Sequence, residues 1–206
     1  MIIGKFESPH SSYDVVKIVR SLGFFNIETG PWVAGGAVRR MFTDGIIHVS
    51  DIDIFYKNEE DFEKISKMIE SRDDYKSNST NFAYKTFILK NENVYILQLI
   101  KKPFLSVNEL LNDFDFTICM AATDGWNWIT DDRFFNHLEK KILFLNNFTP
   151  ERRSKISISK RIAKYCSYGF TPIPNLVTTM CGFRGDVFLE NLTSEGVFKS
   201  NDETKY

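Results

Sequence analysis

The most informative stretch of the chain reads WVAGGAVRRMF at residues 32–42, and SDIDIFY follows at residues 50–56. Residues 32–34 are apolar and lead directly into a glycine pair, after which residues 37–42 are expected to start a helix. Residues 50–56 alternate polar and apolar side chains with the two-residue period of a strand. The predicted order is therefore strand, glycine turn, helix and acidic strand.

The acidic strand carries two carboxylates two positions apart. Side chains at positions i and i+2 of a strand point to the same face, so Asp51 and Asp53 share one face while Ile52 and Ile54 occupy the other. Mg²⁺ prefers oxygen ligands, and two-metal phosphoryl or nucleotidyl transfer needs closely placed carboxylates. The pair Asp51 and Asp53 therefore predicts a magnesium site, with two ions expected.

The glycine pair predicts where a polyphosphate would bind. Adjacent glycines such as Gly35 and Gly36 let the backbone approach a ligand closely, and a helix beginning just after them directs free N–H groups at that ligand. Arg39 and Arg40 follow one turn later and can add positive charge against a triphosphate. A glycine pair or an Asp-x-Asp strand is more often structural when it occurs alone, but their combination favours a nucleotide site.

The rest of the chain predicts an α+β fold around this segment, with a mixed, mostly antiparallel sheet flanked by helices. Residues 1–148 are expected to form one head domain, and residues 149–206 a short basic helical extension with a polar tail. We predict further helices at 13–22, 58–72, 107–111, 132–140 and 150–169, and two hairpins, one from 84–89 and 94–100 and one from 114–122 and 126–129.

The composition narrows the class of protein. Of 206 residues, 43% are hydrophobic and 15% aromatic, which is enough to bury a core. A net charge of -1 excludes a uniformly basic nucleic-acid-binding protein, so a polyanion site must be a local patch. The chain has no long uncharged apolar run, and its three cysteines lack the spacing of a zinc site, which favours a cytoplasmic protein without a membrane partner. The sequence sets no oligomeric state.

Residues 152–165 contain six basic side chains and no acidic one. Arg153, Lys160 and Lys164 fall along one side of a helix at seven- and four-residue steps, which favours a patch. Such a face can bind RNA or a triphosphate, and Arg161 and Lys164 are our candidates for nucleotide contacts. The alternative is an ordinary solvated helix surface.

Two segments resemble a known superfamily. GGAVR at residues 35–39 with SDIDIF at residues 50–55 is similar to the signature of the DNA polymerase beta-like nucleotidyltransferases. NDFDFTICMA at residues 112–121 resembles the Arg-Arg-Asp-Phe-Thr-Ile-Asn-Ala-Leu-Ala segment of the CCA-adding tRNA nucleotidyltransferases and bacterial poly(A) polymerases. The resemblance spans roughly residues 30–130 and is looser through the basic helix.

The resemblance implies a nucleotidyltransferase fold and a magnesium-dependent transfer of a nucleoside monophosphate from a nucleoside triphosphate to an acceptor hydroxyl. It implies metal binding by Asp51 and Asp53 and triphosphate contacts from Gly35, Gly36 and Arg39. Ser50, which precedes the acidic pair, is assigned to the same nucleotide site. Asp115 is similar to a motif aspartate of the family and is assigned to catalysis and to nucleotide binding.

Three residues depart from the family pattern. Arg40 replaces an acidic residue, Phe114 replaces an arginine, and Gln98 stands on the strand that usually supplies a third carboxylate. Either Asp115 supplies that carboxylate from a neighbouring strand, or metal binding is weakened, because a neutral amide cannot replace a carboxylate's charge. The alternative to an enzyme is therefore a catalytically degenerate relative that binds a nucleotide, RNA or a protein and regulates it.

We do not expect a full tRNA clamp from the C-terminal extension, residues 149–206, and the acceptor is therefore left open. An RNA end, a tRNA acceptor stem, a protein hydroxyl and a small molecule such as an aminoglycoside all fit the sequence. The basic helix favours RNA among them.

Overall fold

The computed structural model describes residues 1–6, 14–43, 51–80, 84–89, 95–146, 155–173 and 176. The chain divides into two compact units, one formed by Met1–Phe114 with Ile118–Phe134 and the other by Asp115–Thr117 with Phe135–Tyr206. The first unit contains the large sheet, and the second contains the C-terminal helix. The predicted domain boundary after residue 148 lies outside the described residues.

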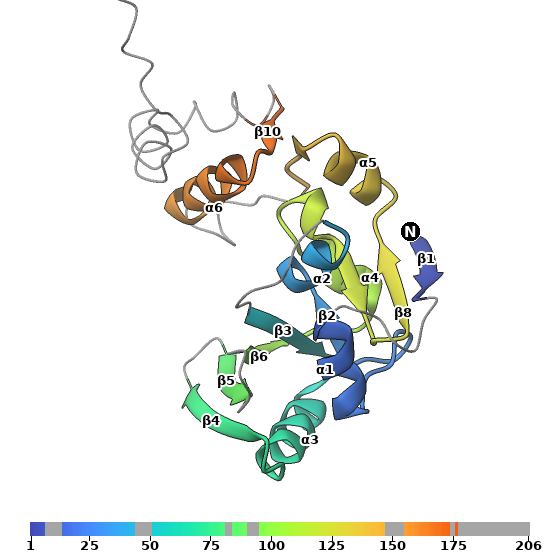
Figure 1. The fold of residues 1–206 in the computed structure, drawn as a ribbon, viewed down its shortest axis with the longest axis vertical. Coiled ribbons are helices and arrows are strands. Elements are labelled where there is room, and N and C mark those ends of the chain that lie inside the picture. The colour runs from blue at the N-terminus through green and yellow to red at the C-terminus, as the bar shows by residue number, and fades with distance from the viewer. Residues whose placement is uncertain are drawn as a thin grey trace, which may run out of the picture. The chain divides into compact units, whose positions relative to one another are not determined.

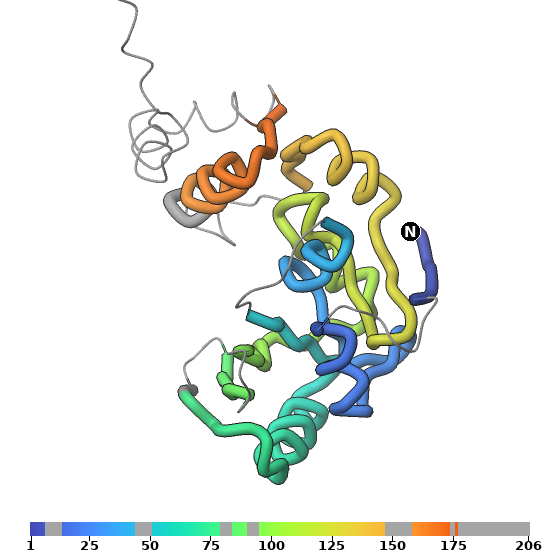
Figure 2. Tube along the Cα trace, in the orientation of Figure 1, coloured from blue at the N-terminus to red at the C-terminus, as the bar shows by residue number. Residues whose placement is uncertain are grey.

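An eight-stranded sheet is the framework of the first unit, with the strand order β1-β8-β7-β2-β3-β6-β5-β4 (Figure 1). Among its described pairs only β3 and β6 run parallel, and these two strands lie side by side although they are far apart in the sequence (Figure 2). The sheet is thus mixed and mostly antiparallel, as predicted. Its strands are β1 (Ile2–Lys5), β2 (Trp32–Ala34), β3 (Asp51–Tyr56), β4 (Tyr75–Thr80), β5 (Tyr84–Leu89), β6 (Ile96–Pro103), β7 (Ala121–Thr123) and β8 (Asn127–Thr130).

Helices flank this sheet, and helices with short strands make up the described part of the second unit. The predicted helices are confirmed within the described residues, with ends that differ by a few positions. The first unit holds α1 (Asp14–Leu22), α2 (Gly36–Met41), α3 (Glu59–Glu70) and α4 (Val107–Asn112). The second unit holds α5 (Phe134–Glu139, whose first residue belongs to the first unit), β9 (Ile142–Leu143), α6 (Lys155–Ser167) and β10 (Thr171–Pro172). The 3-10 turn Thr117–Cys119 includes residues of both units.

The helix α3 shows how local sequence sets these elements. Asn58 caps it by accepting a hydrogen bond from the backbone N–H of Asp61, which satisfies one of the free donors of the first turn. Phe62, Ile65 and Ile69 recur at helical spacing and are buried. The helix therefore packs one apolar stripe and leaves its charged face in water.

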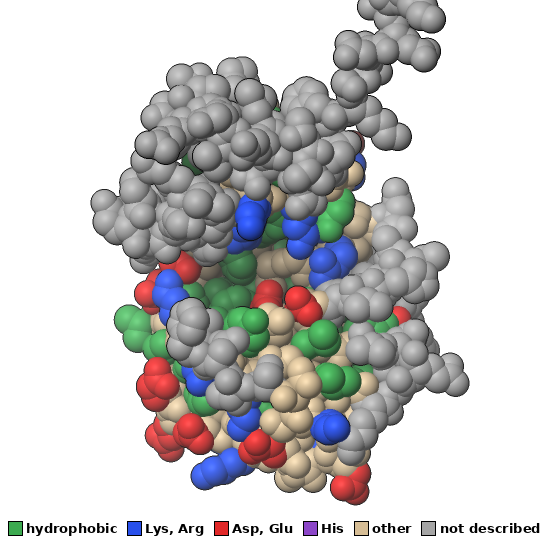
Figure 3. All heavy atoms as spheres, turned by 90° about the vertical axis from the view of Figure 1, so that its left-hand side faces the viewer, with side chains coloured by type: hydrophobic (Ala, Val, Ile, Leu, Met, Phe, Trp, Pro, Cys, Tyr) green, Lys and Arg blue, Asp and Glu red, His purple; other side chains and the backbone are tan. Residues whose placement is uncertain are grey.

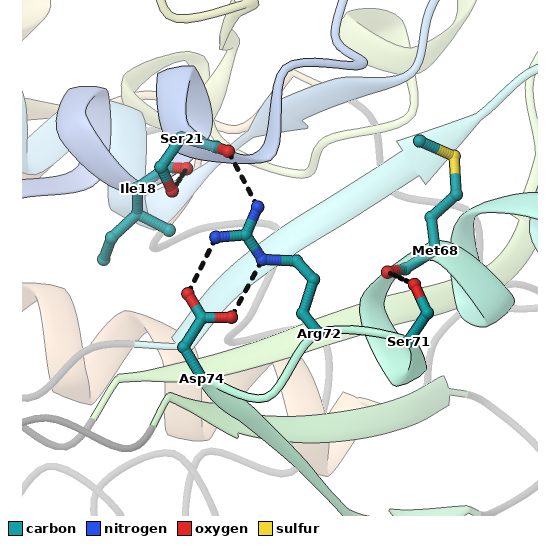
Figure 4. A network of polar contacts seen from close by, with 6 residues as sticks. All are labelled: Ile18, Ser21, Met68, Ser71, Arg72 and Asp74. Atoms are coloured by element: carbon teal, nitrogen blue, oxygen red, sulfur yellow. Dashed lines mark hydrogen bonds and ion pairs between the residues drawn. The ribbon is translucent and has the colours of Figure 1, made fainter.

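The C-terminal ends of α1 and α3 are joined by a polar network (Figure 4). The guanidinium of Arg72 donates to both carboxylate oxygens of Asp74, at 2.9 and 2.7 Å, and to the backbone oxygen of Ser21 at 2.9 Å. Arg72 thereby ties the segment after α3 to the end of α1.

The two faces of the sheet have separate cores. Ile52, Ile54 and Leu97 are fully buried on one face. On the opposite face the residues of α4 pack with Trp32, Ala34 and Phe55 in one hydrophobic cluster. Asp51 and Asp53 belong to this second face, and Asp53 pairs with Ala34 of the cluster, so the acidic pair lies at the border of this core.

Three parts of the sheet differ from the sequence-based expectation. The edge strand β1 was not predicted; its Gly4 lies under the ring of Trp128, where a Cβ would be 2.1 Å from the nearest ring atom. The other edge strand, β4, was also missed because its sequence YKSNST is polar and does not alternate. The predicted strand at 114–122 is a strand only from Ala121, since Thr117–Cys119 form a 3-10 turn.

Within the described residues, no helix combines the length and the apolar character that crossing a membrane requires.

Candidate active site

The glycine pair is a tight bend between β2 and α2. Gly35 has φ +80° and ψ -134°, a conformation essentially reserved for glycine. Its N–H donates to the backbone oxygen of Ala121 at 2.9 Å, and a Cβ at Gly35 would be 2.9 Å from the Cε1 atom of Phe114. Phe114 also packs edge-on against Phe55, with 6.0 Å between the ring centroids. Gly35 is therefore required both by its backbone conformation and by the space available.

Gly36 begins α2, and the two arginines of that helix have different surroundings. Arg39 is 5% exposed, whereas Arg40 is half-buried. The guanidinium of Arg40 folds back toward the start of the helix. A Cβ placed at Gly36 would lie 3.6 Å from its Nη1 atom. Its Nη2 donates to the backbone oxygen of Asp51 at 3.5 Å. Arg40 thus lies between the glycine bend and the beginning of β3.

The two carboxylates lie at the start of β3, on the same side of the sheet. Asp51 is exposed and Asp53 is half-buried. Asp53 pairs directly with Ala34 of β2, and Gly35 is the next residue of that chain segment. Residues paired in this way have Cα atoms about 4.5–5.5 Å apart, so the acidic pair is adjacent to the glycine bend. Figure 3, which draws the side of the molecule from which β3 starts, shows acidic side chains next to one another at the surface.

The strand on the other side of β3 supplies no third carboxylate. Gln98 pairs with Asp53, and Thr86 of β5 pairs with Gln98. Directly paired residues share a face, so Asp53, Gln98 and the buried Thr86 form one row across the sheet. Thr86 was missed from the sequence, because its place in this row depends on the register of two strand pairs.

The residues present fit one magnesium ion better than two. Mg²⁺ is commonly held by one or two carboxylates together with waters and substrate phosphates. Asp51 and Asp53 provide these carboxylates. Over the described part of the chain there is no group of three His, Cys, Asp or Glu side chains that could hold a metal. The prediction of two ions on Asp51 and Asp53 is therefore not supported by a third acidic ligand.

The other candidates belong to the second unit. Asp115 is fully buried, and its carboxylate forms an ion pair with the guanidinium of Arg161 at 2.9 Å. The same guanidinium carbon lies 5.8 Å from the ring centroid of Phe116. The strands beside β3 are β2 and β6, and Asp115 lies on neither of them. It therefore does not supply the third carboxylate from a neighbouring strand. Its contact with a nucleotide stays a prediction.

The helix α6 retains part of the predicted basic face. Lys160 and Lys164 are exposed and four positions apart, while Ile158 and Ile162 are buried. Side chains four positions apart lie on the same side of a helix. Arg153 and Ser50 lie outside the described residues. The structure therefore brings Gly35, Gly36, Arg39, Arg40, Asp51 and Asp53 together in the first unit, and Asp115, Arg161 and Lys164 in the second.

Comparison with solved structures identifies the fold. A CCA-adding enzyme in complex with ATP has a TM-score of 0.66 at 16% identity, covering 95% of this chain and 50% of that one. A Thermotoga maritima CCA-adding enzyme complexed with tRNA has a TM-score of 0.63 at 16% identity, with the same coverages of 95% and 50%. A tRNA nucleotidyltransferase with a primer tRNA and an incoming ATP analogue has a TM-score of 0.57 at 17% identity, covering 88% and 54%. This chain thus has a nucleotidyltransferase fold and spans about half the length of these enzymes.

Comparison by sequence identifies the family. No match was found among curated proteins. The model of the Gabija anti-defense 2 family matches residues 10–141, a range that contains the glycine bend, the acidic pair, Gln98 and Asp115. Because this match covers well over half of the chain, the chain belongs to the Gabija anti-defense 2 family.

Proposed function

We propose that this protein transfers a nucleoside monophosphate from a nucleoside triphosphate to an acceptor hydroxyl. The observation that carries the proposal is the pairing of Asp53 with Ala34, which brings the acidic pair next to the Gly35 bend. Two carboxylates beside a bend that permits close backbone approach are what a metal-bound triphosphate requires. The nucleotidyltransferase fold supports this assignment.

Each group of the site has a separate part in the proposed reaction. Asp51 and Asp53 would hold Mg²⁺, which supplies charge neutralisation on the phosphates and activation of the acceptor hydroxyl. At Gly36 the nearest described atom to a Cβ position is the Arg40 Nη1 at 3.6 Å, so a triphosphate could approach the backbone there, and Arg40 presents a guanidinium between the bend and Asp51. Most of the rate would come from positioning and from these fixed charges.

An RNA end is the acceptor that we propose first. CCA-adding enzymes, whose fold this chain shares, include structures with bound tRNA. The exposed Lys160 and Lys164 of α6 offer two positive charges on one side of a helix, which suits a phosphate backbone. A protein hydroxyl is the main competing acceptor, because the family name refers to counteracting a defence named Gabija.

A nucleotide-binding regulator without catalysis is the second candidate. The pairing of the neutral Gln98 with Asp53 favours it, since one expected metal-binding charge is missing. Both candidates predict nucleotide binding, and only the first predicts transfer.

Label transfer separates the two candidates. The protein is incubated with Mg²⁺, each α-labelled nucleoside triphosphate in turn, and either a mixed RNA pool or a protein extract. We expect label on RNA, and a loss of about a hundredfold or more in Asp51→Asn and Asp53→Asn, because a bound metal supplies several kcal/mol. Glu63→Gln, which removes one exposed carboxylate from α3, is the matched control and should transfer normally.

Three results are informative. Label on protein instead of RNA would change the acceptor but keep the reaction. Nucleotide binding without any transfer would favour the regulator. Transfer that survives in both aspartate variants would contradict the assignment of the site.

A further inference from the structure

The missing carboxylate and the added arginine are neighbours in the structure. Gln98 occupies the position paired with Asp53, where its amide contributes no charge. Arg40 lies beside Asp51, at the same end of β3, with its guanidinium held by the backbone oxygen of that residue at 3.5 Å. Compared with the resembling family, Gln98 removes one negative charge from this group of side chains, and Arg40 puts a positive charge in place of a second one.

The position of Arg40 follows from its place in α2. Side chains on a helix lean toward its N-terminus, so a residue four positions after Gly36 reaches back over that glycine. Here the Nη1 atom lies 3.6 Å from where a Gly36 Cβ would be. The guanidinium is consequently between the glycine bend and Asp51, the interval in which a triphosphate held by the acidic pair would lie.

One arginine can compensate for the charge of a second Mg²⁺ and its carboxylate ligand. A second Mg²⁺ together with a third carboxylate adds a net charge of plus one to a nucleotidyltransferase site. A guanidinium adds the same net charge, and its fixed fork of N–H donors can bind two phosphate oxygens. With one ion, Gln98 and Arg40, the charge around the triphosphate is at least as positive as in a site with two ions, a third carboxylate and an acidic residue at position 40.

We infer that the site binds a single divalent cation with its nucleotide, and that Arg40 supplies the positive charge of the second. The inference rests on the proposed nucleotide site, but it does not require that transfer occurs. It gives Arg40 a role as a nucleotide-contacting residue and explains why Gln98 can be tolerated in this position.

Counting bound manganese tests the inference directly. Free Mn²⁺ is measured by electron paramagnetic resonance as the full chain is titrated in the presence of saturating non-hydrolysable α,β-methylene triphosphates of the four ribonucleosides, one at a time. After subtracting the Mn²⁺ held by unbound analogue, we expect one Mn²⁺ in total per complex of chain and best-bound analogue, with the ion that accompanies the nucleotide included in that count. Asp53→Asn should remove it.

Nucleotide affinity tests the part assigned to Arg40. Arg40→Gln should weaken analogue binding roughly tenfold or more, with and without Mn²⁺, since hydrogen bonds to charged groups contribute about 1.5–3 kcal/mol. The Mn²⁺ count should remain one. Lys64→Gln, which removes one exposed positive charge from α3, should leave both the affinity and the count unchanged.

A reversal completes the test. The double variant Arg40→Asp with Gln98→Asp restores an acidic residue at both positions and should bind a second Mn²⁺. If this variant does not fold, the count on the unmodified chain still decides the question.

Several results would overturn the inference: two Mn²⁺ on the unmodified chain, none at all, or an affinity for every analogue that Arg40→Gln leaves unchanged. These outcomes differ from failure of the proposed function. One Mn²⁺ per complex and an analogue affinity that depends on Arg40, without label transfer, would refute the proposed transfer reaction and keep the inference. Two Mn²⁺ per complex together with label transfer would refute the inference and keep the proposed transfer reaction.

Discussion

The two glycines of the bend should respond very differently to the same substitution. Gly35→Ala places a methyl group at a backbone with φ +80° and within 2.9 Å of the Phe114 ring. Backbone strain of this kind costs about 1–3 kcal/mol, and overpacking costs about 1–3 kcal/mol, so we expect Gly35→Ala to lower the free energy of unfolding by about 2–6 kcal/mol. Gly36→Ala meets its nearest neighbour, the Arg40 Nη1, only at 3.6 Å and lies in a helix. It should change the free energy of unfolding by less than about 1 kcal/mol, because alanine is the better helix former.

Urea unfolding of the two variants measures this difference. Adding Phe114→Ala to each variant isolates the steric part, since the ring that meets the new methyl group is then absent. We expect Gly35→Ala to cost only its backbone strain, about 1–3 kcal/mol, in that background. The cost of Gly36→Ala should be the same in both backgrounds.

Two results would refute the reasoning. If Gly35→Ala and Gly36→Ala destabilise the protein equally, the bend does not have the geometry described. If Phe114→Ala leaves the cost of Gly35→Ala unchanged, the ring does not confine this position.

Three further predictions concern the rest of the chain. Arg161→Gln should lower the free energy of unfolding by about 3–5 kcal/mol in urea experiments, because it removes the guanidinium that lies 2.9 Å from the fully buried Asp115 carboxylate, and a smaller cost when Asp115→Asn is already present would confirm the pairing. Burial first, and then the hydrogen bond to the Asp14 carboxylate, raise the pKa of Tyr95 to about 12, so its contribution to stability should be complete below pH 10.0 and be lost as the pH rises toward 12. Tyr95→Phe should make the decline of the urea midpoint over that interval shallower, and an equal decline in both proteins would contradict it. Burial raises the pKa of the Cys166 thiol, so mass spectrometry of that peptide should show alkylation by iodoacetamide to be slower at neutral pH than in urea-unfolded protein.

The acidic strand and the glycine turn could be predicted because their signals are local. A two-residue period places Asp51 and Asp53 on one face whatever the strand pairs with, and a glycine pair after an apolar run indicates a bend. The antiparallel partners β5 and β6 were also predictable from local sequence, since a short polar stretch separates two runs that are rich in strand-forming residues. The superfamily resemblance added the overall fold, which the structural comparisons confirm.

Contacts between distant segments could not be predicted in this way. The pairing of Ala34 with Asp53 depends on the order of strands in the sheet, which local periodicity does not encode. The ion pair between Asp115 and Arg161 joins a turn and a helix that are far apart in the chain. Phe114 was noted only as a departure from a family pattern, and its function as the ring that confines Gly35 required the tertiary structure.

The paired arginines of α2 show most clearly what tertiary structure adds to sequence. Sequence alone gave Arg39 and Arg40 the same role, as cations near a triphosphate. Consecutive residues of a helix point about 100° apart, so two neighbours cannot both face the same ligand in the same way. Arg39 is almost completely buried, while Arg40 reaches Gly36 and the backbone of Asp51. An acidic residue at position 40, as in the resembling family, would differ from this arginine by two units of charge at the edge of the metal site. A change of that size at such short range alters how much cation charge a bound triphosphate needs, which is why acidic residues at positions 40 and 98 together should raise the metal count.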